Sequence, residues 1–402
     1  MRLGYLYSRY PVLSQTFCDA EMLELERRGL SLVVASMYPP KTPLRHEYLA
    51  RLQAPVHYAP EKPELEALVR KAKRKGRWPE SLIAEHERKY GPDYKAELRA
   101  RNALFFVDLF ERERVPHLHV HFANRAAHTA LFVKAISGIP FSVTAHGQDF
   151  MTDLGNAELL REICAGAEFV AAETDYSRDL LARACPDSAS KIFRVYNGIE
   201  LQKFPPARAA SSAAEPIRLL SVGRLVEFKG FDVLIDACVA LRRNQLDFTC
   251  EIIGSGDLHD ALQTQIANND VTGQVTLAGE RSQDYVLSAL ANCDIFVLAA
   301  VVDARGASDV FPTVIAEAMT SAKPVVSTTV AGIPELVAAG ETGLLVPPRD
   351  AIALARAIEQ LARDQTLRER MGNAGRKRIE TEFTIEHTIE PLLKLFAAHP
   401  GR

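Results

Sequence analysis

The 402-residue sequence lacks several features that mark specialised classes of protein. Its six cysteines are dispersed and form no C-x-x-C pair, which argues against a disulfide framework or a cysteine-built zinc site. Lys and Arg total 48 against 51 for Asp and Glu, so the basic excess typical of nucleic-acid binding is missing. No stretch reaches the ~20 apolar residues needed to span a bilayer, and no secretion signal begins the chain. We therefore expect a soluble, cytoplasmic protein, with at most peripheral contact with the inner face of the plasma membrane.

The chain does have 47% hydrophobic residues, arranged as short apolar strands that alternate with helical stretches. Strands of this kind, each followed by a helix, predict parallel sheets covered by helices on both faces. Prolines, serines and alanines interrupt the alternation at 201–216, in the manner of a linker. The sequence thus predicts an α/β fold of two Rossmann-like, doubly wound domains, over 1–200 and 217–382, that face each other across a cleft.

A helical insertion at 61–101 interrupts the first domain and carries 12 Lys and Arg against 8 Asp and Glu, a local excess of four. Its most basic part runs from Arg70 to Trp78. A basic cluster that ends in tryptophan is typical of a segment that rests on anionic lipid headgroups. The alternative is a solvated helix face, because runs of charge are common on exposed helices.

The stretch from Asp309 to Met319 sets two carboxylates eight positions apart across a predicted helix start. Pro312 suits the first helical position, which leaves Asp309 in the preceding loop and puts Glu317 on the helix, away from its apolar stripe. Free N–H groups at the helix start would suit phosphate or polarised hydroxyls. Read alone, the two carboxylates could equally be a loop or capping residue and a solvated charge.

Two glycine-containing clusters follow predicted strands of the second domain. Gly223 and Arg224 end one strand and Lys229 starts the next helix, so two cations lie where a diphosphate would fit. A Gly-Ser-Gly turn at 254–256 repeats this layout. The dinucleotide pattern GxGxxG is absent, because His259 takes the third glycine position, and this counts against a nicotinamide-dependent dehydrogenase.

Together with the segments Gly332–Leu336 and Gly343–Pro347, these motifs resemble the family-four retaining glycosyltransferases over about residues 218–350. In the first half, the segments 7–17 and 144–149 resemble the subgroup that builds bacterial exopolysaccharides, including colanic-acid-type enzymes. The resemblance implies a GT-B fold with an acceptor-binding first domain, a donor-binding second domain and a last helix, over 383–402, that crosses back. It also implies a UDP- or GDP-sugar donor, a glycan or polyprenyl-linked acceptor, and no metal or other cofactor.

The resemblance also implies roles for single residues. Arg224 and Lys229 would hold the donor phosphates. Glu317 would bind the ribose hydroxyls and Asp309 the donor sugar, and His146 would lie beside the transferring sugar, so that these three form the catalytic set. The chain departs from the family at Asp309, where glutamate is usual. The further candidates are, on the donor side, Gly223, Gly254, Gly256, Val310, Phe311 and Thr313 and, on the acceptor side, Ser14, Gln15 and Asp149.

We therefore predict a retaining hexosyltransferase of polysaccharide biosynthesis. Arg224 and Lys229 would stabilise the charge that develops on the departing diphosphate. In the family's same-face mechanism the departing phosphate oxygen takes the acceptor proton, so no strong protein base and no metal is needed. Two alternatives stay open: a catalytically silent sugar-nucleotide binder that acts as an assembly partner, and a nucleotide-sugar epimerase of the same fold.

A hydrolase that uses Asp309 and Glu317 as acid and nucleophile is disfavoured. Eight helical residues span ~12 Å, whereas the paired carboxylates of retaining hydrolases lie ~5 Å apart. Asp303 could supply another carboxylate, but we interpret it as a mobile or solvent-facing loop residue.

The histidines of the first domain allow more than one interpretation. His117, His119 and His121 alternate on one strand and so share a face. With no nearby cysteine, we interpret this row as structural or acceptor-facing rather than as a metal site. For His146, the alternative to a functional role is a buried histidine hydrogen-bonded to backbone.

Overall fold

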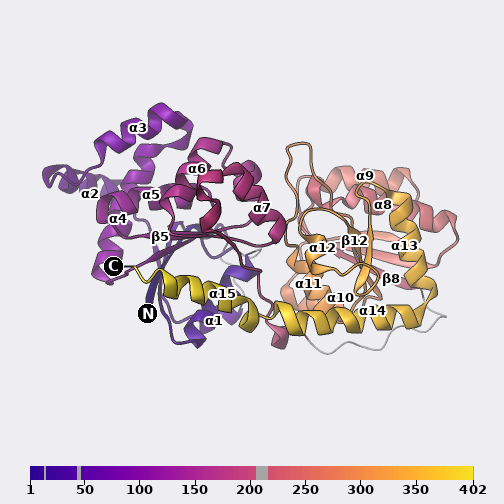
Figure 1. Ribbon diagram of the computed structural model, residues 1–402. Coiled ribbons are helices and arrows are strands. Elements are labelled where there is room, and N and C mark those ends of the chain that lie inside the picture. The colour runs from indigo at the N-terminus through magenta and orange to yellow at the C-terminus, as the bar shows by residue number, and fades with distance from the viewer. Residues whose placement is uncertain (13–14, 43–46, 205–215, 402) are drawn as a thin grey trace. The chain divides into compact units, whose positions relative to one another are not determined.

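The structure is a computed structural model that describes residues 1–12, 15–42, 47–204 and 216–401 (Figure 1). It contains two compact units: unit 1 is Met1–Tyr196 with Thr388–Arg402, and unit 2 is Asn197–His387. The predicted linker at 201–216 lies mostly outside the described residues, and the predicted domain limits stay a prediction.

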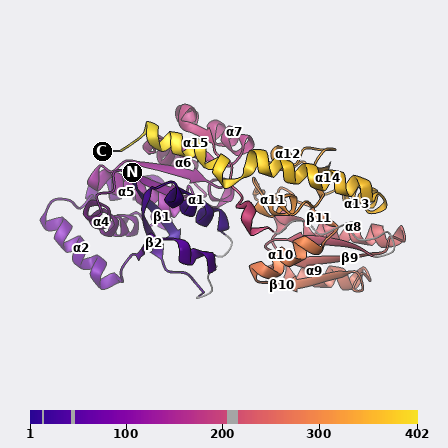
Figure 2. The same cartoon turned by 90° about the horizontal axis from the view of Figure 1, so that it is seen from below.

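Unit 1 is built on a parallel sheet with the strand order β3-β2-β1-β4-β5-β6-β7. Successive side chains of a strand point to opposite faces. Leu6 therefore packs with α4 and α5 on one face, while Tyr5 and Tyr7 pack with α1 and α15 on the other. These four helices are labelled in Figure 2. The helices and strands that contribute to unit 1 are β1 (Arg2–Arg9), α1 (Thr16–Arg27), β2 (Ser31–Tyr38), β3 (Val56–Tyr58), α2 (Lys62–Arg74), α3 (Glu80–Tyr90), α4 (Ala96–Arg112), β4 (Leu118–His121), α5 (Arg125–Ser137), β5 (Phe141–Ala145), α6 (Ala157–Gly166), β6 (Val170–Ala172), α7 (Asp175–Ala184), β7 (Ile192–Arg194) and α15 (Ile385–Ala398).

Unit 2 has a second parallel sheet, in the order β10-β9-β8-β11-β12-β13. Its central strand β11 reads Ile-Phe-Val-Leu and is buried along its whole length, as a strand covered on both faces must be. The helices and strands of unit 2 are β8 (Ile217–Val222), α8 (Phe231–Arg243), β9 (Phe248–Ile253), α9 (His259–Asn268), β10 (Val275–Gly279), α10 (Gln283–Asn292), β11 (Ile295–Leu298), α11 (Thr313–Thr320), β12 (Val325–Thr328), α12 (Ile333–Leu336), β13 (Gly343–Val346), α13 (Ala351–Arg363) and α14 (Gln365–Arg378).

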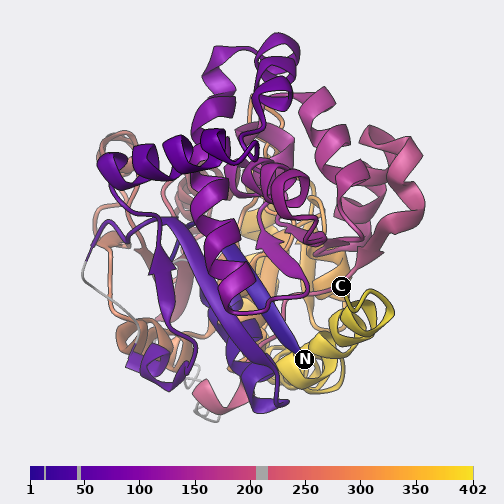
Figure 3. The same ribbon diagram turned by 90° about the vertical axis from the view of Figure 1, so that its left-hand side faces the viewer.

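The two sheets confirm the predicted α/β class with two Rossmann-like, doubly wound domains. The insertion at 61–101 is helical as predicted, since it contains α2, α3 and the start of α4. Both termini belong to unit 1, where they lie close together (Figure 3). In each sheet the strand order reverses once, between β1 and β4 and between β8 and β11, and the carboxyl ends beside such a point are where open α/β sheets bind ligands.

Candidate functional site

The loop after β8 brings the two predicted phosphate-binding cations together in unit 2. Lys229 closes the 3₁₀ turn Glu227–Lys229 just before α8. The guanidinium of Arg224 and the ammonium of Lys229 lie 5.8 Å and 6.0 Å from the ring centre of Phe228. A Cβ at Gly223 would lie 3.3 Å from the Lys229 side chain, so glycine keeps room for that stem. Both cations therefore lie near Phe228, in the loop at the carboxyl end of β8.

The glycines of the turn after β9 pack directly on this loop. A Cβ on Gly254 would lie 1.9 Å from the carbonyl oxygen of Gly223, and one on Gly256 would lie 2.5 Å from that of Leu225. The backbone N–H of Leu225 donates to the carbonyl of Ser255 at 2.9 Å. The structure thus requires glycine at 254 and 256 for packing, and their contact with a donor stays a prediction.

Asp309 lies beside the same cations, because its carboxylate forms an ion pair with the ammonium of Lys229. The two side chains are 15% and 12% exposed, so the pair is largely shielded from water. Val310 and Phe311 are buried, and their contact with a donor stays a prediction. Pro312 precedes α11 as its N-cap instead of occupying the predicted first helical position, so Thr313 begins the helix.

Glu317 is a half-buried residue on α11 whose carboxylate forms no hydrogen bond or ion pair within the described residues. Burial raises its pKa to about 7, although Lys203 and Lys229 both act to lower it. A shielded carboxylate of this kind has unused acceptor capacity, which hydroxyl groups of a ligand can satisfy.

Our interpretation of Asp303 as mobile or solvent-facing is wrong. The residue is buried, and its carboxylate accepts the backbone N–H groups of Arg305 and Ala307, each at 2.8 Å. Asp303 therefore shapes its own loop.

In unit 1, Asp149 joins the loops that follow β4 and β5. Its carboxylate accepts the N–H of Ala123 at 2.5 Å and that of His146 at 2.9 Å. Burial raises the pKa of Asp149 to about 6, against the opposing effects of His146 and the Ala123 N–H. The buried Asp149 fixes the backbone at His146, and its acceptor-side role stays a prediction.

The His146 ring is one link in a buried chain of hydrogen bonds. Its Nδ1 lies 2.6 Å from Glu173, and its Nε2 lies 2.8 Å from Nδ1 of His121. The Nε2 of His121 lies 3.0 Å from Glu21, which also accepts the hydroxyl of Tyr5 at 2.7 Å. The His146 side chain is only 5% exposed, in line with our alternative, but its ring is bonded to side chains instead of backbone.

The hydrogen-bonded chain needs one proton between its two rings. With Glu173 and Glu21 ionised, each ring donates an N–H to its carboxylate, which leaves His121 Nδ1 and His146 Nε2 facing each other. Two lone pairs at 2.8 Å would repel, so this arrangement requires a proton between them, and the two carboxylates flank the charge that it brings. Burial opposes that charge on His146, but Glu173, Asp149 and Glu21 outweigh it and raise the pKa of the ring.

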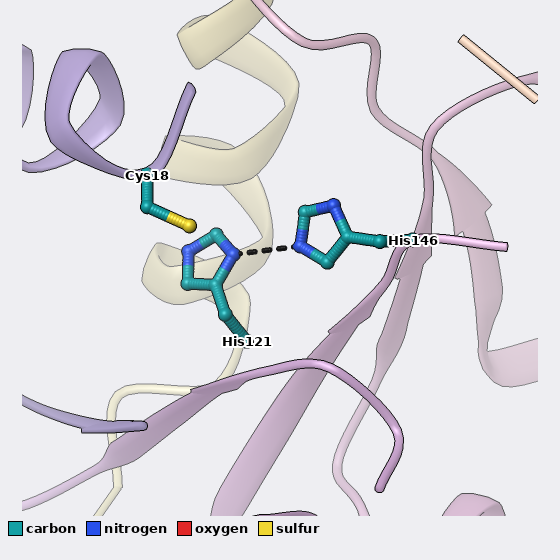
Figure 4. Close-up of side chains that lie close together, drawn as sticks. All are labelled: Cys18, His121 and His146. Atoms are coloured by element: carbon teal, nitrogen blue, oxygen red, sulfur yellow. Dashed lines mark hydrogen bonds between the residues drawn. The ribbon is translucent and has the colours of Figure 1, made fainter. Parts of the chain in front are cut away.

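Cys18 lies beside the rings of His121 and His146 (Figure 4). Our premise that no cysteine lies near the histidine row is therefore wrong. Ligand atoms of Cys18, His121 and His146 all lie within 4.8 Å of one another. Two imidazoles on one zinc ion at ~2.0 Å would keep their nitrogens ~3.3 Å apart, wider than the 2.8 Å here. Burial and the nearby carboxylates also raise the pKa of the Cys18 thiol. Hydrogen bonds hold the two rings as they lie, and the absence of a metal stays a prediction.

The other two histidines of the strand are buried and bonded within the sheet. His117 Nε2 and His119 Nδ1 both lie 2.8 Å from the Ser142 hydroxyl. On the acceptor side, Ser14 lies outside the described residues, while the buried side-chain oxygen of Gln15 has no hydrogen-bond partner in the described chain.

The basic segment from Arg70 to Trp78 spans the end of α2 and the turn after it. Its cations are exposed, but Trp78 packs partly against the core of unit 1. Lys73 lies over the Trp78 ring at 5.8 Å, and Arg77 pairs with Glu111 at 2.8 Å. Among the described residues, no helix is long and apolar enough to cross a membrane.

Comparisons with known proteins agree with this architecture. Residues 22–203 match the family described as Glycosyltransferase Family 4, and residues 206–378 match Glycosyl transferases group 1. An amylovoran biosynthesis glycosyltransferase of Erwinia amylovora is 30% identical over 95% of this chain and 96% of its own length. An Escherichia coli (strain K12) glycosyltransferase, assigned provisionally to colanic acid biosynthesis, is 34% identical over 53% of this chain and 52% of its own.

Solved structures give the same fold. The Anabaena protein HepE, in complex with UDP and glucose, has a TM-score of 0.75 at 18% identity and covers 99% of this chain and 100% of its own. A glycosyltransferase from Rickettsia africae has a TM-score of 0.74 at 17% identity, over 99% of this chain and 98% of its own. The predicted GT-B class, with its two Rossmann-like domains, is confirmed.

Proposed function

Since this chain belongs to the family 4 glycosyltransferases, we propose that it is a retaining hexosyltransferase that uses a nucleotide diphosphate sugar. The acceptor is a hydroxyl of a glycan or polyprenyl-linked sugar, and the pathway is polysaccharide biosynthesis, as the names of its relatives suggest. The observation that carries the proposal is the unpaired carboxylate of Glu317, which feels the charge of Lys229 in the loop after β8. A nucleotide sugar needs both, because it combines a diphosphate with ribose hydroxyls.

In this proposal Arg224 and Lys229 neutralise the departing diphosphate, and its oxygen takes the acceptor proton. Glu317 binds the ribose hydroxyls, and Asp309 binds the donor sugar after its ion pair with Lys229 is shared with phosphate. The bound UDP of HepE supports a UDP-sugar, and a GDP-sugar is the second candidate. These residues supply the charge stabilisation themselves, so the proposal includes no metal or other cofactor.

On the acceptor side, Glu173 and His121 hold the His146 ring in one orientation, in which it would lie beside the transferring sugar. The unpartnered oxygen of Gln15 supports its proposed contact with an acceptor hydroxyl. Exposed cations from Arg70 to Arg77 would hold the protein at the inner face of the plasma membrane. Sedimentation with anionic phosphatidylserine vesicles, against phosphatidylcholine vesicles, tests that contact, and equal binding to both would refute it.

A thermal-shift screen of UDP- and GDP-sugars tests donor use. A donor at a hundredfold excess over its dissociation constant adds about 2.7 kcal/mol of stability. We expect one donor to raise the melting temperature of the wild type and to have little effect on Lys229→Ala. No shift with any donor would count against the proposal. Proton NMR of the product then tests retention, because the new linkage must keep the anomeric configuration of the donor.

A further inference from the structure

Three arginines gather in unit 1 at the point where its strand order reverses. Arg9 is the last residue of β1, and Arg125 begins α5 directly after β4. Tyr38 ends β2 and pairs in register with Arg9. Because β1, β2 and β4 are parallel, these residues lie at one edge of the sheet. Open α/β sheets bind ligands at the carboxyl ends of their strands, next to the point where the strand order reverses.

Arg99, in the first turn of α4, reaches the same place and is only 3% exposed. Its guanidinium interacts with Tyr38, and one terminal nitrogen lies 3.8 Å from the sulfur of Met37. Its buried Nε has no hydrogen-bond acceptor in the described part of the chain. Burial lowers the pKa of Arg99, and the nearby Arg125 lowers it further.

The cluster has positive charge without a counter-ion. Arg9 lies over the Tyr38 ring at 5.4 Å, and its guanidinium donates to the carbonyl of Pro39. Arg125 is exposed. Within the described residues, no carboxylate forms an ion pair with Arg9, Arg99 or Arg125. Arg99 has a phenol as its partner but no carboxylate, and its Nε has no acceptor among the described residues. Buried charge that is not compensated is costly, which points to an anion at this place.

We propose that Arg9, Arg99, Arg125 and Tyr38 bind a phosphate group of the acceptor substrate. A phosphate offers several oxygens to the three guanidiniums and the phenol, and the amino end of α5 adds N–H groups. The assignment to the acceptor rests on the proposed function. His146 follows β5, and the cluster follows β4, β1 and β2, which lie one, two and three strands away. At ~4.8 Å per strand, the separation is centred on about 10 Å, which leaves room for a sugar between phosphate and reacting hydroxyl, so the acceptor class is a glycosyl phosphate or diphosphate.

Calorimetric titration of inorganic diphosphate into the full-length protein tests the site. The Lys229→Ala variant serves as the parent, since it lacks the proposed donor-phosphate site. We expect inorganic diphosphate to bind the parent saturably, and to bind at least tenfold more weakly after Arg125→Gln or Arg9→Gln. Arg112→Gln, at the opposite end of α4, is the control and should leave the binding unchanged. Binding that ignores Arg125→Gln and Arg9→Gln, or no saturable binding to the parent, would overturn the proposal.

A transfer assay separates an acceptor phosphate from free phosphate. It compares a lipid-linked glycosyl diphosphate with the same sugar lacking phosphate. We expect Arg125→Gln to lower the kcat/KM ratio of these acceptors at least tenfold, and Arg112→Gln to leave it unchanged. An unchanged ratio with weakened diphosphate binding would assign the site to free phosphate and overturn the acceptor role. Arg125-dependent binding without transfer from any donor would instead contradict the proposed function and leave the anion site in place.

Discussion

Glu317 is a carboxylate whose surroundings oppose its charge. Burial raises its pKa to about 7, above the ordinary value of 4.5, so the folded protein binds a proton that the unfolded chain releases between these values. The contribution of Glu317 to stability is therefore greatest below pH 4.5 and is lost as the pH rises through 7. A group kept at this cost is expected to serve binding instead of folding.

Replacement of Glu317 by glutamine should consequently stabilise the fold and weaken donor binding. At pH 8 we expect Glu317→Gln to raise the free energy of unfolding by about 2 kcal/mol, and at pH 4 we expect no difference. Urea denaturation at the two pH values measures both, with the exposed Glu341→Gln as control. The same variant should bind the donor at least tenfold more weakly. Equal stabilities at pH 8 would show that Glu317 is not destabilised by its charge.

Asp309 and Lys229 satisfy each other in the absence of donor. Asp309→Asn leaves a shielded ammonium without its counter-ion, which should lower the free energy of unfolding by about 2 kcal/mol. A diphosphate replaces the lost charge, so UDP should raise the melting temperature of Asp309→Asn more than that of the wild type. Thermal unfolding with and without UDP measures this difference. A smaller shift in the variant would mean that Asp309 assists phosphate binding directly.

At the scale of elements, the hydrogen-bonded chain through His146 ties together α1, β4 and the loops after β5 and β6. The raised pKa of His146 means that its contribution to stability is fully present below pH 6.5 and is lost as the pH rises through the raised value. Glu173→Gln should therefore lower the melting temperature by several degrees at pH 6 and much less at pH 10.

The second histidine pair of unit 1 supplies the control. His86 and His128 lie 2.9 Å apart, but burial lowers the pKa of both rings. Glu162→Gln, beside His86, should not reproduce the pH dependence of Glu173→Gln. Nitrogen-15 NMR of the imidazoles should also show one cationic ring at the His121–His146 pair and none at His86–His128. Two neutral rings at His146 and His121 would refute the shared proton.

The turn after β9 depends on glycine for close contact between two loops. A Cβ at Gly254 would lie 1.9 Å from the Gly223 carbonyl oxygen, and its φ of +146° disfavours other residues. We expect Gly254→Ala to destabilise the protein by about 3 kcal/mol or more. Gly273→Ala is the matched control, because a Cβ at that position would have no neighbouring atom within 4 Å. Chemical denaturation compares the two, and similar losses would contradict the packing argument.

The sequence could predict the elements and the loops of the donor site, because both follow local patterns. Apolar strands, glycine turns and the start of α11 lie within short windows, so Arg224 and Lys229 could be placed after a strand and Glu317 on the helix that follows Pro312. The chain through His146 could not be found in this way. Glu21, His121 and Glu173 lie far apart in sequence and meet only when the sheet forms. The ion pair of Lys229 with Asp309 likewise joins two loops.

For the whole molecule, each unit has its own sheet and its own core, and each carries its own set of polar groups. Unit 2 holds cations and an unpaired carboxylate suited to a nucleotide diphosphate. Unit 1 holds the His146 chain and the three arginines. This division matches a reaction in which one substrate is recognised through its diphosphate and ribose, and the other through a second anion. On the proposed function, catalysis requires both sets of groups.

The most direct test of the central claim is the release of nucleoside diphosphate coupled to sugar transfer onto a lipid-linked acceptor. We predict that the wild type forms product from one UDP- or GDP-sugar, and that Lys229→Ala lowers kcat/KM at least a hundredfold, about 2.7 kcal/mol of lost transition-state stabilisation. Equal, slow release of nucleoside diphosphate by the wild type and Lys229→Ala, with and without acceptor, would contradict the account.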